Sequence, residues 1–456
     1  MVALRASRAG RVEKIVMKSG VQIEQPPLSV MMDELDAIGE SATAFPATIQ
    51  VSVPELQAWS WLNANASLPR VAWVDRSSND VLAGVGVASQ VDVRAEAEPS
   101  LTFRRCRELL KGSKALRFFG GFSFDGSDCW SSLGAGKFVI PRFTLSDGVL
   151  TLAVMDQQDI EQARDDLRAL IISELPLDAS IPEPVSKSYQ PTFNGWQSRV
   201  DESLALIDRE VVEKIVLSRK TELTFDSPLN SIALAANLHA ATHDCFVFCF
   251  NFGEDTAFVG ATPERLFHRE GRMLQSEVVA GTRMRGATAE EDERLSIELL
   301  TSDKDQREHD IVRKSIRQKL HQFIEHLDVD SQASILRLAR KQHLRSNVHG
   351  ELKAEVDDGK LLSKLHPTPA VGGYPTENAL PEISRIEPYN RGWYAAPVGW
   401  IGADNAHFAV AIRSGLVEGN TLSLFSGAGI VRGSEPEQEW NEVENKIQDF
   451  LSIIGS

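Results

Sequence analysis

The chain has 456 residues, of which 42% are apolar and 25% charged, and its formal net charge at pH 7 is −16. This composition is typical of a globular protein, and the length suits two or three domains or one large intertwined unit. The acidic balance argues against nucleic acid or an anionic membrane as a partner, since both require basic surface. An anionic metabolite remains compatible, provided that a metal ion and a few placed cations supply a local positive field.

The first 30 residues are predicted to be a leader without stable structure. Five basic residues stand against the single acid Glu13 within positions 1–18, and no apolar stretch of the secretory type follows. No apolar run reaches the ~20 residues that a membrane span requires. Cys245 and Cys249 lie in an apolar run without a CxxC pair, which favours reduced core thiols in a cytoplasmic protein. A monomer is expected, because no long apolar patch or heptad pattern stands out.

Residues 31–190 are predicted to form a region rich in β-strands. The patterning indicates a hairpin around a polar turn, a strand with two glycines and a helix, at residues 71–87, 118–124 and 159–172 respectively. Residues 175–195 contain four prolines and show little periodicity. We therefore place the main boundary of the chain within this stretch.

Residues 191–456 show sharper patterns. An apolar helical face between Trp196 and Val211 leads into a strand at 214–219. Ser434 and Glu437 fit a capping box at the start of a C-terminal helix, so Glu437 is not assigned a metal role. The other expected elements are strands at 245–252, 256–260, 277–280, 396–401, 408–416 and 421–425 and a helical block from residue 290 to about residue 327.

Two acidic pairs each open an apolar helical face. Asp305 and Glu308 stand one turn apart and precede apolar residues at helical spacing, as do Glu439 and Glu442. Carboxylates aligned with a buried stripe are costly to desolvate unless positive charge meets them. Either pair alone would suit first-turn acids that favour the helix dipole. Two pairs with the same spacing favour a hard divalent cation, most simply Mg²⁺, held by oxygen ligands.

Seven short motifs follow one another in the second region. They are KIVLSR from residue 214, ATPERL from 261, AGTRMRG from 280, SDKDQREH from 302, HPTPAVGG from 366, GAGIV from 427 and EWNEVENK from 439. Their order and spacing resemble the chorismate-utilising enzymes, which include isochorismate synthase, salicylate synthase, anthranilate synthase component I and aminodeoxychorismate synthase. The resemblance implies an α+β fold of large, mainly antiparallel β-sheets packed with helices, in which residues 191–456 form the chorismate-binding catalytic region.

Within this family the segment 365–373 resembles the isochorismate synthase branch. Ala280 stands where aminodeoxychorismate synthases have a nucleophilic lysine, and the N-terminal region lacks the Leu-Leu-Glu-Ser feedback motif of anthranilate synthases. The resemblance implies an isomerase that adds water at C2 of chorismate and removes the C4 hydroxyl. Salicylate synthase, which also eliminates pyruvate, and a catalytically silent relative are the alternatives. The downstream pathway stays open between menaquinone, phylloquinone and a siderophore.

The resemblance also assigns roles to individual residues. It implies that Glu308 and Glu442 bind Mg²⁺ directly, whereas Asp305 and Glu439 reach it through water. It makes Lys214 the base and Glu264 the acid. The substrate contacts that it implies are Gly281, Thr282, His366, Tyr394, Arg413, Gly427, Gly429 and Lys446.

The residues by themselves leave simpler readings open for several of these positions. Lys214 also suits a lysine at a strand end, and Glu264 a turn acid after proline. Arg413 suits a structural ion pair and Tyr394 a core residue. Glu264 lies between Pro263 and an apolar dipeptide, an environment that would keep a carboxylic acid protonated.

Overall fold

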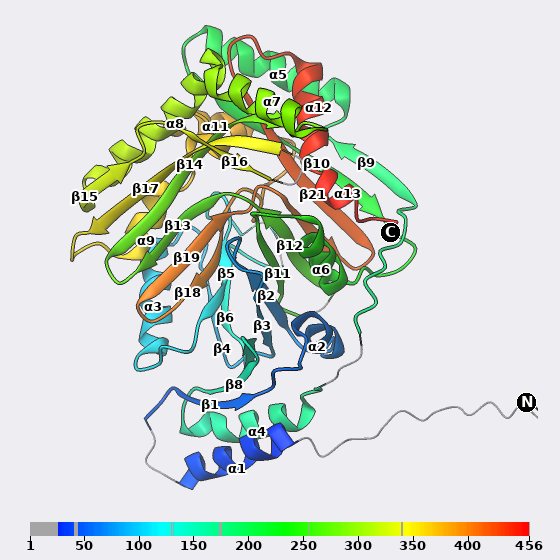
Figure 1. Ribbon diagram of the computed structural model, residues 1–456, viewed down its shortest axis with the longest axis vertical. Helices are drawn as coiled ribbons and strands as arrows, with labels where there is room; N and C mark the ends of the chain where they lie inside the picture. Colours follow the sequence, from blue (N-terminus) through cyan, green and yellow to red (C-terminus); the bar gives the residue numbers. More distant parts are fainter. Residues whose placement is uncertain are drawn as a thin grey trace, which may run out of the picture.

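Two large antiparallel sheets and the helices around them make up the computed structural model, which describes residues 26–40, 44–128, 130, 132–172, 176–253, 255–338 and 341–455 (Figure 1). Residues 1–25 of the predicted leader lie outside the described residues, and helix α1 begins at Pro26, inside the predicted leader range. None of the helices in the described ranges is both long and apolar enough to cross a membrane.

The first sheet has 11 strands, and both regions of the sequence contribute to it. Strand β2 from the N-terminal region pairs with β11 from the second region, with Val71 opposite Phe250. In spatial order the strands are β1 (Ala47–Ser52), β8 (Val149–Val154), β7 (Phe143–Ser146), β3 (Val81–Val85), β2 (Arg70–Val74), β11 (Phe246–Asn251), β12 (Thr256–Thr262), β20 (Ser414–Glu418), β21 (Thr421–Ile430), β10 (Ile215–Thr224) and β9 (Ser186–Gln190).

The second sheet has ten strands, and both regions of the sequence contribute to it as well. Strand β5 pairs with β18, with Phe119 opposite Trp400. In spatial order the strands are β15 (Ile324–Val329), β17 (Lys341–Leu352), β14 (Met273–Met284), β13 (Arg265–Glu270), β19 (Asn405–Val410), β18 (Pro397–Ile401), β5 (Phe118–Phe122), β6 (Gly136–Ile140) and β4 (Ser89–Asp92), and β16 (Ser334–Arg337) pairs with β17.

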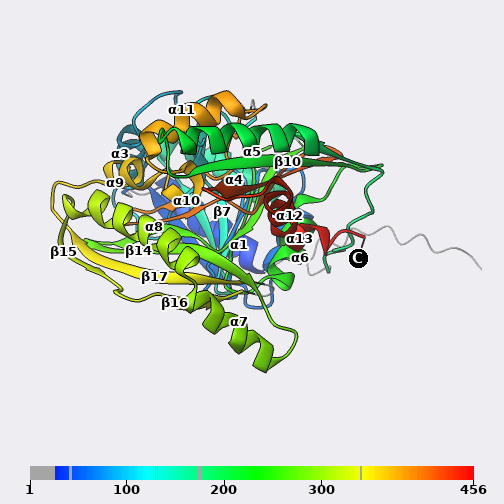
Figure 2. The same cartoon turned by 90° about the horizontal axis from the view of Figure 1, so that it is seen from above.

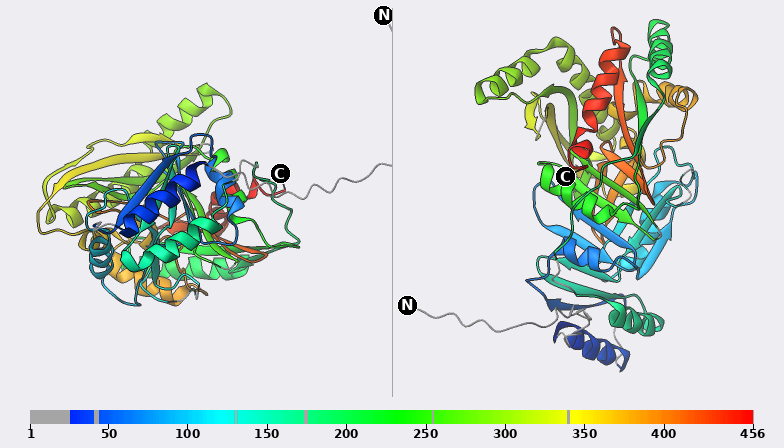
Figure 3. Two further views of the ribbon diagram at one scale, coloured as in Figure 1. Left: turned by 90° about the horizontal axis from the view of Figure 1, so that it is seen from below. Right: turned by 90° about the vertical axis from the view of Figure 1, so that its right-hand side faces the viewer.

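The helices cover both sheets. Helices α1 and α4 lie side by side next to β1 and β8, at the end of the molecule opposite α8 and α12 (Figures 1 and 3). Viewed from above, α7 projects away from the body (Figure 2). The helices are α1 (Pro26–Glu40), α2 (Ala58–Ala64), α3 (Pro99–Leu110), α4 (Ile160–Ala169), α5 (Phe193–Asp208), α6 (Ser231–Ala241), α7 (Ala289–Thr301), α8 (Asp303–His321), α9 (Asp358–Leu365), α10 (Pro369–Gly372), α11 (Thr376–Ile386), α12 (Pro436–Lys446) and α13 (Gln448–Leu451).

Strand β11 shows how the sequence builds two cores at once. Its alternate residues Phe246, Phe248 and Phe250 belong to the core between the two sheets. The intervening Val247 and Cys249 belong to the core beneath α1, α2, α4 and α6. Because successive side chains of a strand point to opposite faces, an unbroken apolar run is what a strand buried on both faces requires. The prediction of a buried strand here is confirmed.

Three sequence-based predictions need correction. The helical block does not reach residue 327, because α8 ends at His321 and Ile324–Val329 is strand β15. The single strand at 408–416 is two strands, since the chain turns between β19 and β20 to pass from one sheet to the other. Helix α12 begins at Pro436 with Glu435 as its N-cap, so Ser434 makes no capping box; its hydroxyl accepts a hydrogen bond from Val431 N instead.

Candidate active site

A cavity of about 220 Å³ collects the side chains of the sequence motifs. The predicted site residues that line it are Lys214, Glu264, Gly281, Thr282, Asp305, Glu308, Tyr394, Arg413, Gly427, Gly429, Glu439, Glu442 and Lys446. Six basic and five acidic side chains line its wall. The whole chain is acidic, but acidic side chains are not in excess in this cavity. An anionic ligand can therefore bind there.

Helices α8 and α12 supply one wall of the cavity, which we call the acidic wall: Asp305 and Glu308 from α8, and Glu439 and Glu442 from α12. Ser302 caps α8 by accepting a hydrogen bond from Asp305 N, so the helix begins two residues before the first carboxylate of the acidic wall. The apolar face behind it buries Val312, Ile316 and Leu320. The acidic pairs therefore face the cavity because the stripes that follow them pack in the cores.

Cations pair with three of the four carboxylates of the acidic wall. Lys214 Nζ lies 2.7 Å from Glu308 Oε1, and Lys446 Nζ lies 2.7 Å from Glu442 Oε1. These lysines are the main reason that the pKa values of Glu308 and Glu442 are lowered. Arg283 Nη2 lies 2.8 Å from Asp305 Oδ2. Burial, in contrast, raises the pKa of Glu439.

The acidic wall suits a hard divalent cation by its donor chemistry, because all four groups offer carboxylate oxygens to one cavity. The negative charge of Glu308 also acts on Glu442, so the two helices bring their carboxylates within electrostatic reach. Across the described residues, no three Asp, Glu, His or Cys side chains are grouped closely enough to enclose an ion, and a lysine or arginine pairs with three of the four carboxylates of the acidic wall.

Glu264 lies in the turn between β12 and β13, and only 6% of it is exposed. Burial raises the pKa of its carboxyl group to about 8, and the negative charge of Glu277 acts in the same direction. Its backbone carbonyl accepts a hydrogen bond of 2.9 Å from Val410 N. A carboxyl with this pKa keeps its proton at neutral pH and can donate it, in agreement with the environment expected from the sequence.

Lys214 stands immediately before strand β10 and is 4% exposed. Its backbone exchanges two hydrogen bonds with Tyr374, at 3.1 and 2.8 Å. A Cβ atom on Gly429 would lie only 2.6 Å from Lys214 Cε. The glycine of the GAGIV motif therefore leaves space for the lysine side chain, and the segment after HPTPAVGG holds the lysine backbone.

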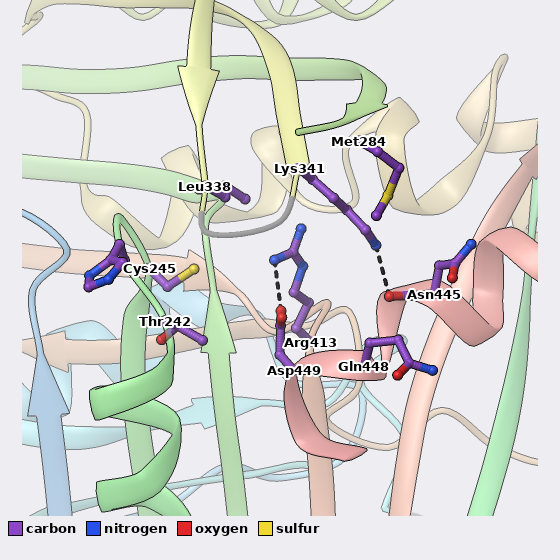
Figure 4. Close-up of a pocket in the computed structure, with 10 residues that line it drawn as sticks. Thr242, Cys245, Met284, Leu338, Lys341, Arg413, Asn445, Gln448 and Asp449 are labelled. Atoms are coloured by element: carbon purple, nitrogen blue, oxygen red, sulfur yellow. Dashed lines mark hydrogen bonds and ion pairs between the residues drawn. The ribbon is translucent and has the colours of Figure 1, made fainter. Parts of the chain in front are cut away.

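Arg413 connects the cavity to a second, smaller one of about 60 Å³ (Figure 4). Its Nη1 lies 3.1 Å from Asp449 Oδ2, as the simpler ion-pair reading proposed, yet the residue also lines the larger cavity. Across the smaller cavity, Lys341 Nζ donates to Asn445 O at 3.0 Å. Burial lowers the pKa of Lys341 to about 7, and the charge of Arg413 contributes.

His343 links Arg413 to the AGTRMRG segment. Arg413 Nη2 donates to His343 Nε2 at 3.3 Å, and His343 Nδ1 lies 3.2 Å from Gly281 O and 3.0 Å from Thr282 Oγ1. Because arginine can only donate, Nε2 must accept, which leaves the ring proton on Nδ1. Burial and the nearby Arg413 lower the pKa of His343 to about 3, so the ring is neutral.

The remaining predicted ligands meet at strand β21. Lys446 Nζ donates to Gly427 O at 2.8 Å. Tyr394 stacks on Phe425 with ring centroids 5.5 Å apart, and its hydroxyl would be 3.0 Å from a Cβ atom on Gly427. Tyr394 is therefore both a core residue, as the simpler reading had it, and a residue of the cavity wall.

His366 is the predicted site residue that the structure places away from the cavity. Its Nε2 donates to Phe124 O at 3.0 Å, and its ring packs edge-on against the Phe124 ring. Burial lowers the pKa of His366 to about 4. The same motif reaches the cavity through Ala370 and Val371 instead.

Sequence reasoning missed four polar residues of the cavity: Arg283, Lys304, His343 and Arg391. Arg283 and Lys304 stand inside recognised motifs, next to residues that were assigned roles, so their motif position was an available signal. His343 lies in β17, a strand that the sequence analysis did not predict. Arg391 is buried against Glu387 and two backbone carbonyl groups.

Residues 33–455 match the family described as chorismate binding enzyme. The isochorismate synthase MenF of Bacillus subtilis is 36% identical over 351 residues, which are 74% of each chain. MenF of Escherichia coli is 31% identical over 430 residues, which are 91% of this chain and 96% of that protein. A solved structure of the E. coli protein, described as the menaquinone-specific isochorismate synthase, superposes with a TM-score of 0.83 at 29% identity and covers 94% of this chain and 99% of its own.

Proposed function

The chain belongs to the chorismate-binding enzyme family, and from that premise we propose that it is an isochorismate synthase, an isomerase that depends on Mg²⁺. It converts chorismate to isochorismate by adding water at C2 and removing the C4 hydroxyl. The observation that carries this proposal is that Lys214 and Glu264, a carboxyl of raised pKa, line the same cavity, which also holds the acidic wall.

Lys214 and Glu264 divide the acid–base work of this isomerisation. In its unprotonated form, Lys214 Nζ takes a proton from the water that attacks C2, and Glu308 beside it stabilises the resulting ammonium, which is the form that makes the ion pair described above. Glu264, which keeps its proton at neutral pH, gives that proton to the departing C4 hydroxyl. The water that attacks and the water that leaves balance, so the product is an isomer of the substrate.

The carboxylates of chorismate are held at two places. Tyr394, Arg413 and the backbone around Gly427 bind the enolpyruvyl carboxylate, with Lys446 and Thr282 nearby. Glu308 and Glu442 would hold Mg²⁺ directly and Asp305 and Glu439 through water, and the ion would supply positive charge for the ring carboxylate. Asp449 and neutral His343 keep the Arg413 guanidinium in place.

We further propose that the enzyme works as a monomer in the cytoplasm. Residues of one chain suffice to line the cavity on all the sides described above. Cys106, Cys245 and Cys249 are buried free thiols, which suits a reducing compartment. Light scattering of the purified protein measures the assembly state.

Chromatography of chorismate incubated with the protein and Mg²⁺ tests the function. We expect isochorismate to accumulate while chorismate remains, because the two regioisomers have similar bonding and neither is strongly favoured. A lactate dehydrogenase assay run in parallel measures pyruvate. Stoichiometric pyruvate with rising salicylate fluorescence would instead identify a salicylate synthase, and the absence of any product would indicate a silent relative.

A further inference from the structure

A buried ion pair lies next to the turn that contains Glu264. Arg76, in the connection between β2 and β3, meets Glu277 of β14 through two parallel hydrogen bonds, at 2.6 and 2.5 Å. The two side chains are 9% and 1% exposed. A bidentate arginine–carboxylate pair with so little solvent has a fixed geometry, because both hydrogen bonds must be kept to offset the cost of burying two charges.

The same two side chains also hold the backbone on both sides of Glu264. Arg76 Nη1 donates to Pro263 O at 2.7 Å, and Glu277 Oε1 accepts a hydrogen bond of 2.8 Å from Arg265 N. The residues before and after Glu264 are thus attached to the two halves of one ion pair. Any loss of the pair frees the turn from which the Glu264 side chain enters the cavity.

The surroundings keep this ion pair rigid and charged. The Arg76 guanidinium lies 5.2 Å from the centre of the Phe246 ring, and Arg265 packs over the same ring at 5.6 Å. Glu277, Asp75 and Asp244 together raise the pKa of Arg76, against the effect of burial. No protonation change of the arginine is therefore expected in the pH range of an assay.

The charges that face Glu264 come from several elements. Lys214 before β10 and Lys446 on α12 favour its ionised form, as does a hydrogen bond from Thr368. Glu277 on β14 opposes them, and its effect comes second only to burial in raising the pKa of Glu264. Glu277 therefore acts on both the position and the protonation of this carboxyl group.

We propose that Arg76 and Glu277 are positioning residues for Glu264, and that through Arg76 the N-terminal region takes part in the reaction without lining the cavity. The inference rests on the proposed function, in which Glu264 is the acid. Every described residue that lines the cavity belongs to positions 214–446. Arg76 lies outside this range and outside the sequence motifs that supply the cavity wall. Its contribution is visible only in the folded chain.

Kinetics of the full-length variants Arg76→Lys and Glu277→Gln test the proposal against a purely structural role. Lysine keeps the positive charge but cannot hold Glu277 at two points and Pro263 O as well. We expect Arg76→Lys to lower kcat by about 10- to 100-fold with little change in KM, since a displacement of about 1 Å at a reacting group can cost on the order of 100-fold.

The pH profile of Glu277→Gln supplies a readout that loss of stability alone would not move. Glutamine can still accept the hydrogen bond from Arg265 N, but the negative charge near Glu264 is gone. The pKa of Glu264 should fall, so kcat should begin to decline at a lower pH than in the wild-type enzyme. Arg76→Lys should keep the wild-type position of this decline.

Arg142→Lys is the matched control. Arg142 is 1% exposed, pairs with Asp159 at 2.6 Å and Asp166 at 2.8 Å, and donates to Ala153 O at 2.7 Å, all away from the cavity. The Arg142→Lys variant should be less thermally stable than the wild-type protein but should have the same kcat. The inference is wrong if folded Arg76→Lys keeps wild-type kcat and Glu277→Gln keeps the wild-type profile, or if Arg142→Lys slows turnover equally. The wild-type assay tests the proposed function separately. If the wild-type protein forms no isochorismate, the proposed function is wrong as well, whereas a failure confined to the variants overturns only the positioning role.

Discussion

Two parts of the cavity wall shift the pKa of glutamate side chains in opposite directions. On the acidic wall, Glu308 and Glu442 each lie 2.7 Å from a lysine, and the lysines lower their pKa values. In the turn between β12 and β13, burial and the charge of Glu277 raise the pKa of Glu264 to about 8. Glu439, on the acidic wall but without a close cation, also has a raised pKa. A cation within hydrogen-bond reach, rather than residue type, decides which of these glutamates stay charged.

The largest effect should follow from removing charge on the acidic wall. Glu308→Gln or Glu442→Gln should lower turnover by about 1,000-fold or more at any practical Mg²⁺ concentration, because a directly bound metal ion is worth several kcal/mol to the reaction. Asp305→Asn and Glu439→Gln, which would alter only water-mediated contacts of the proposed metal site, should cost about 10- to 100-fold.

Thermal unfolding with and without Mg²⁺ separates a metal effect from a folding effect. Wild-type Tm should rise with Mg²⁺, since an ion that binds only the native state stabilises it. Glu308→Gln should fold but lose this rise. Near wild-type turnover in either direct-ligand variant would show that the metal is bound elsewhere.

The next effect concerns the base. Lys214→Ala should reduce kcat by about 100- to 10,000-fold, the usual worth of a general acid or base. Lys220→Ala is the control, because Lys220 lies on the same strand and pairs with Glu222 at 3.3 Å without lining the cavity. Equal rates for Lys214→Ala and wild type would exclude Lys214 as the base.

Removing the proposed acid, Glu264, should give a comparable loss and a change in pH dependence. As the pH rises through about 8, Glu264 loses its proton and kcat of the wild-type enzyme should decline. Glu264→Gln should lower kcat by about 100- to 10,000-fold and abolish this decline. Glu270→Gln, an exposed acid at the end of β13, serves as the control for measurements across the same pH range. A wild-type decline that persists in Glu264→Gln would assign it to another group.

A smaller effect should follow from narrowing the space around Lys214. In Gly429→Ala the new Cβ would meet Lys214 Cε at 2.6 Å and Nζ at 3.1 Å, so the lysine must shift. We expect kcat to fall by about 10- to 100-fold, because the base is displaced rather than removed. Gly39→Ala, where the nearest atom would be 3.9 Å away, should leave kcat unchanged. Unaltered kinetics in Gly429→Ala would mean that Lys214 does not need its present position.

The last effect is on stability rather than on rate, and it sharpens the contrast between the glutamates. Because the folded-state pKa of Glu264 is raised, folding favours its protonated form, and the wild-type protein loses stability as the pH rises from about 4.5 to about 8. Glu264→Gln should become more stable than wild type over this window, by at most about 1.4 kcal/mol per pH unit. Urea unfolding at several pH values measures the difference. A constant difference across the window would contradict the raised pKa.

Much of the site could be predicted because its residues stand in short motifs. Helical spacing placed Asp305, Glu308, Glu439 and Glu442 on two faces, and the structure brings both faces to one cavity. The assignment of His366 shows the limit of this reasoning. A motif marks a segment, but the direction of each side chain depends on its packing, and His366 points to Phe124 while its neighbours reach the cavity.

The sequence by itself determined the class of fold, the family and the elements whose periodicity is strong, such as β11 and α8. The fold class and the family follow from the resemblance of the seven motifs. The elements follow from local patterns, since side-chain alternation and helical spacing depend only on neighbours along the chain. Only the tertiary structure decided that strands from both regions share each sheet, and that β15–β17 carry His343 into the site. It also decided that the charge of Glu277 acts on Glu264, and that Arg76 contacts the residue beside Glu264. Burial and charge at these positions come from residues far apart in the sequence, and no local pattern records them.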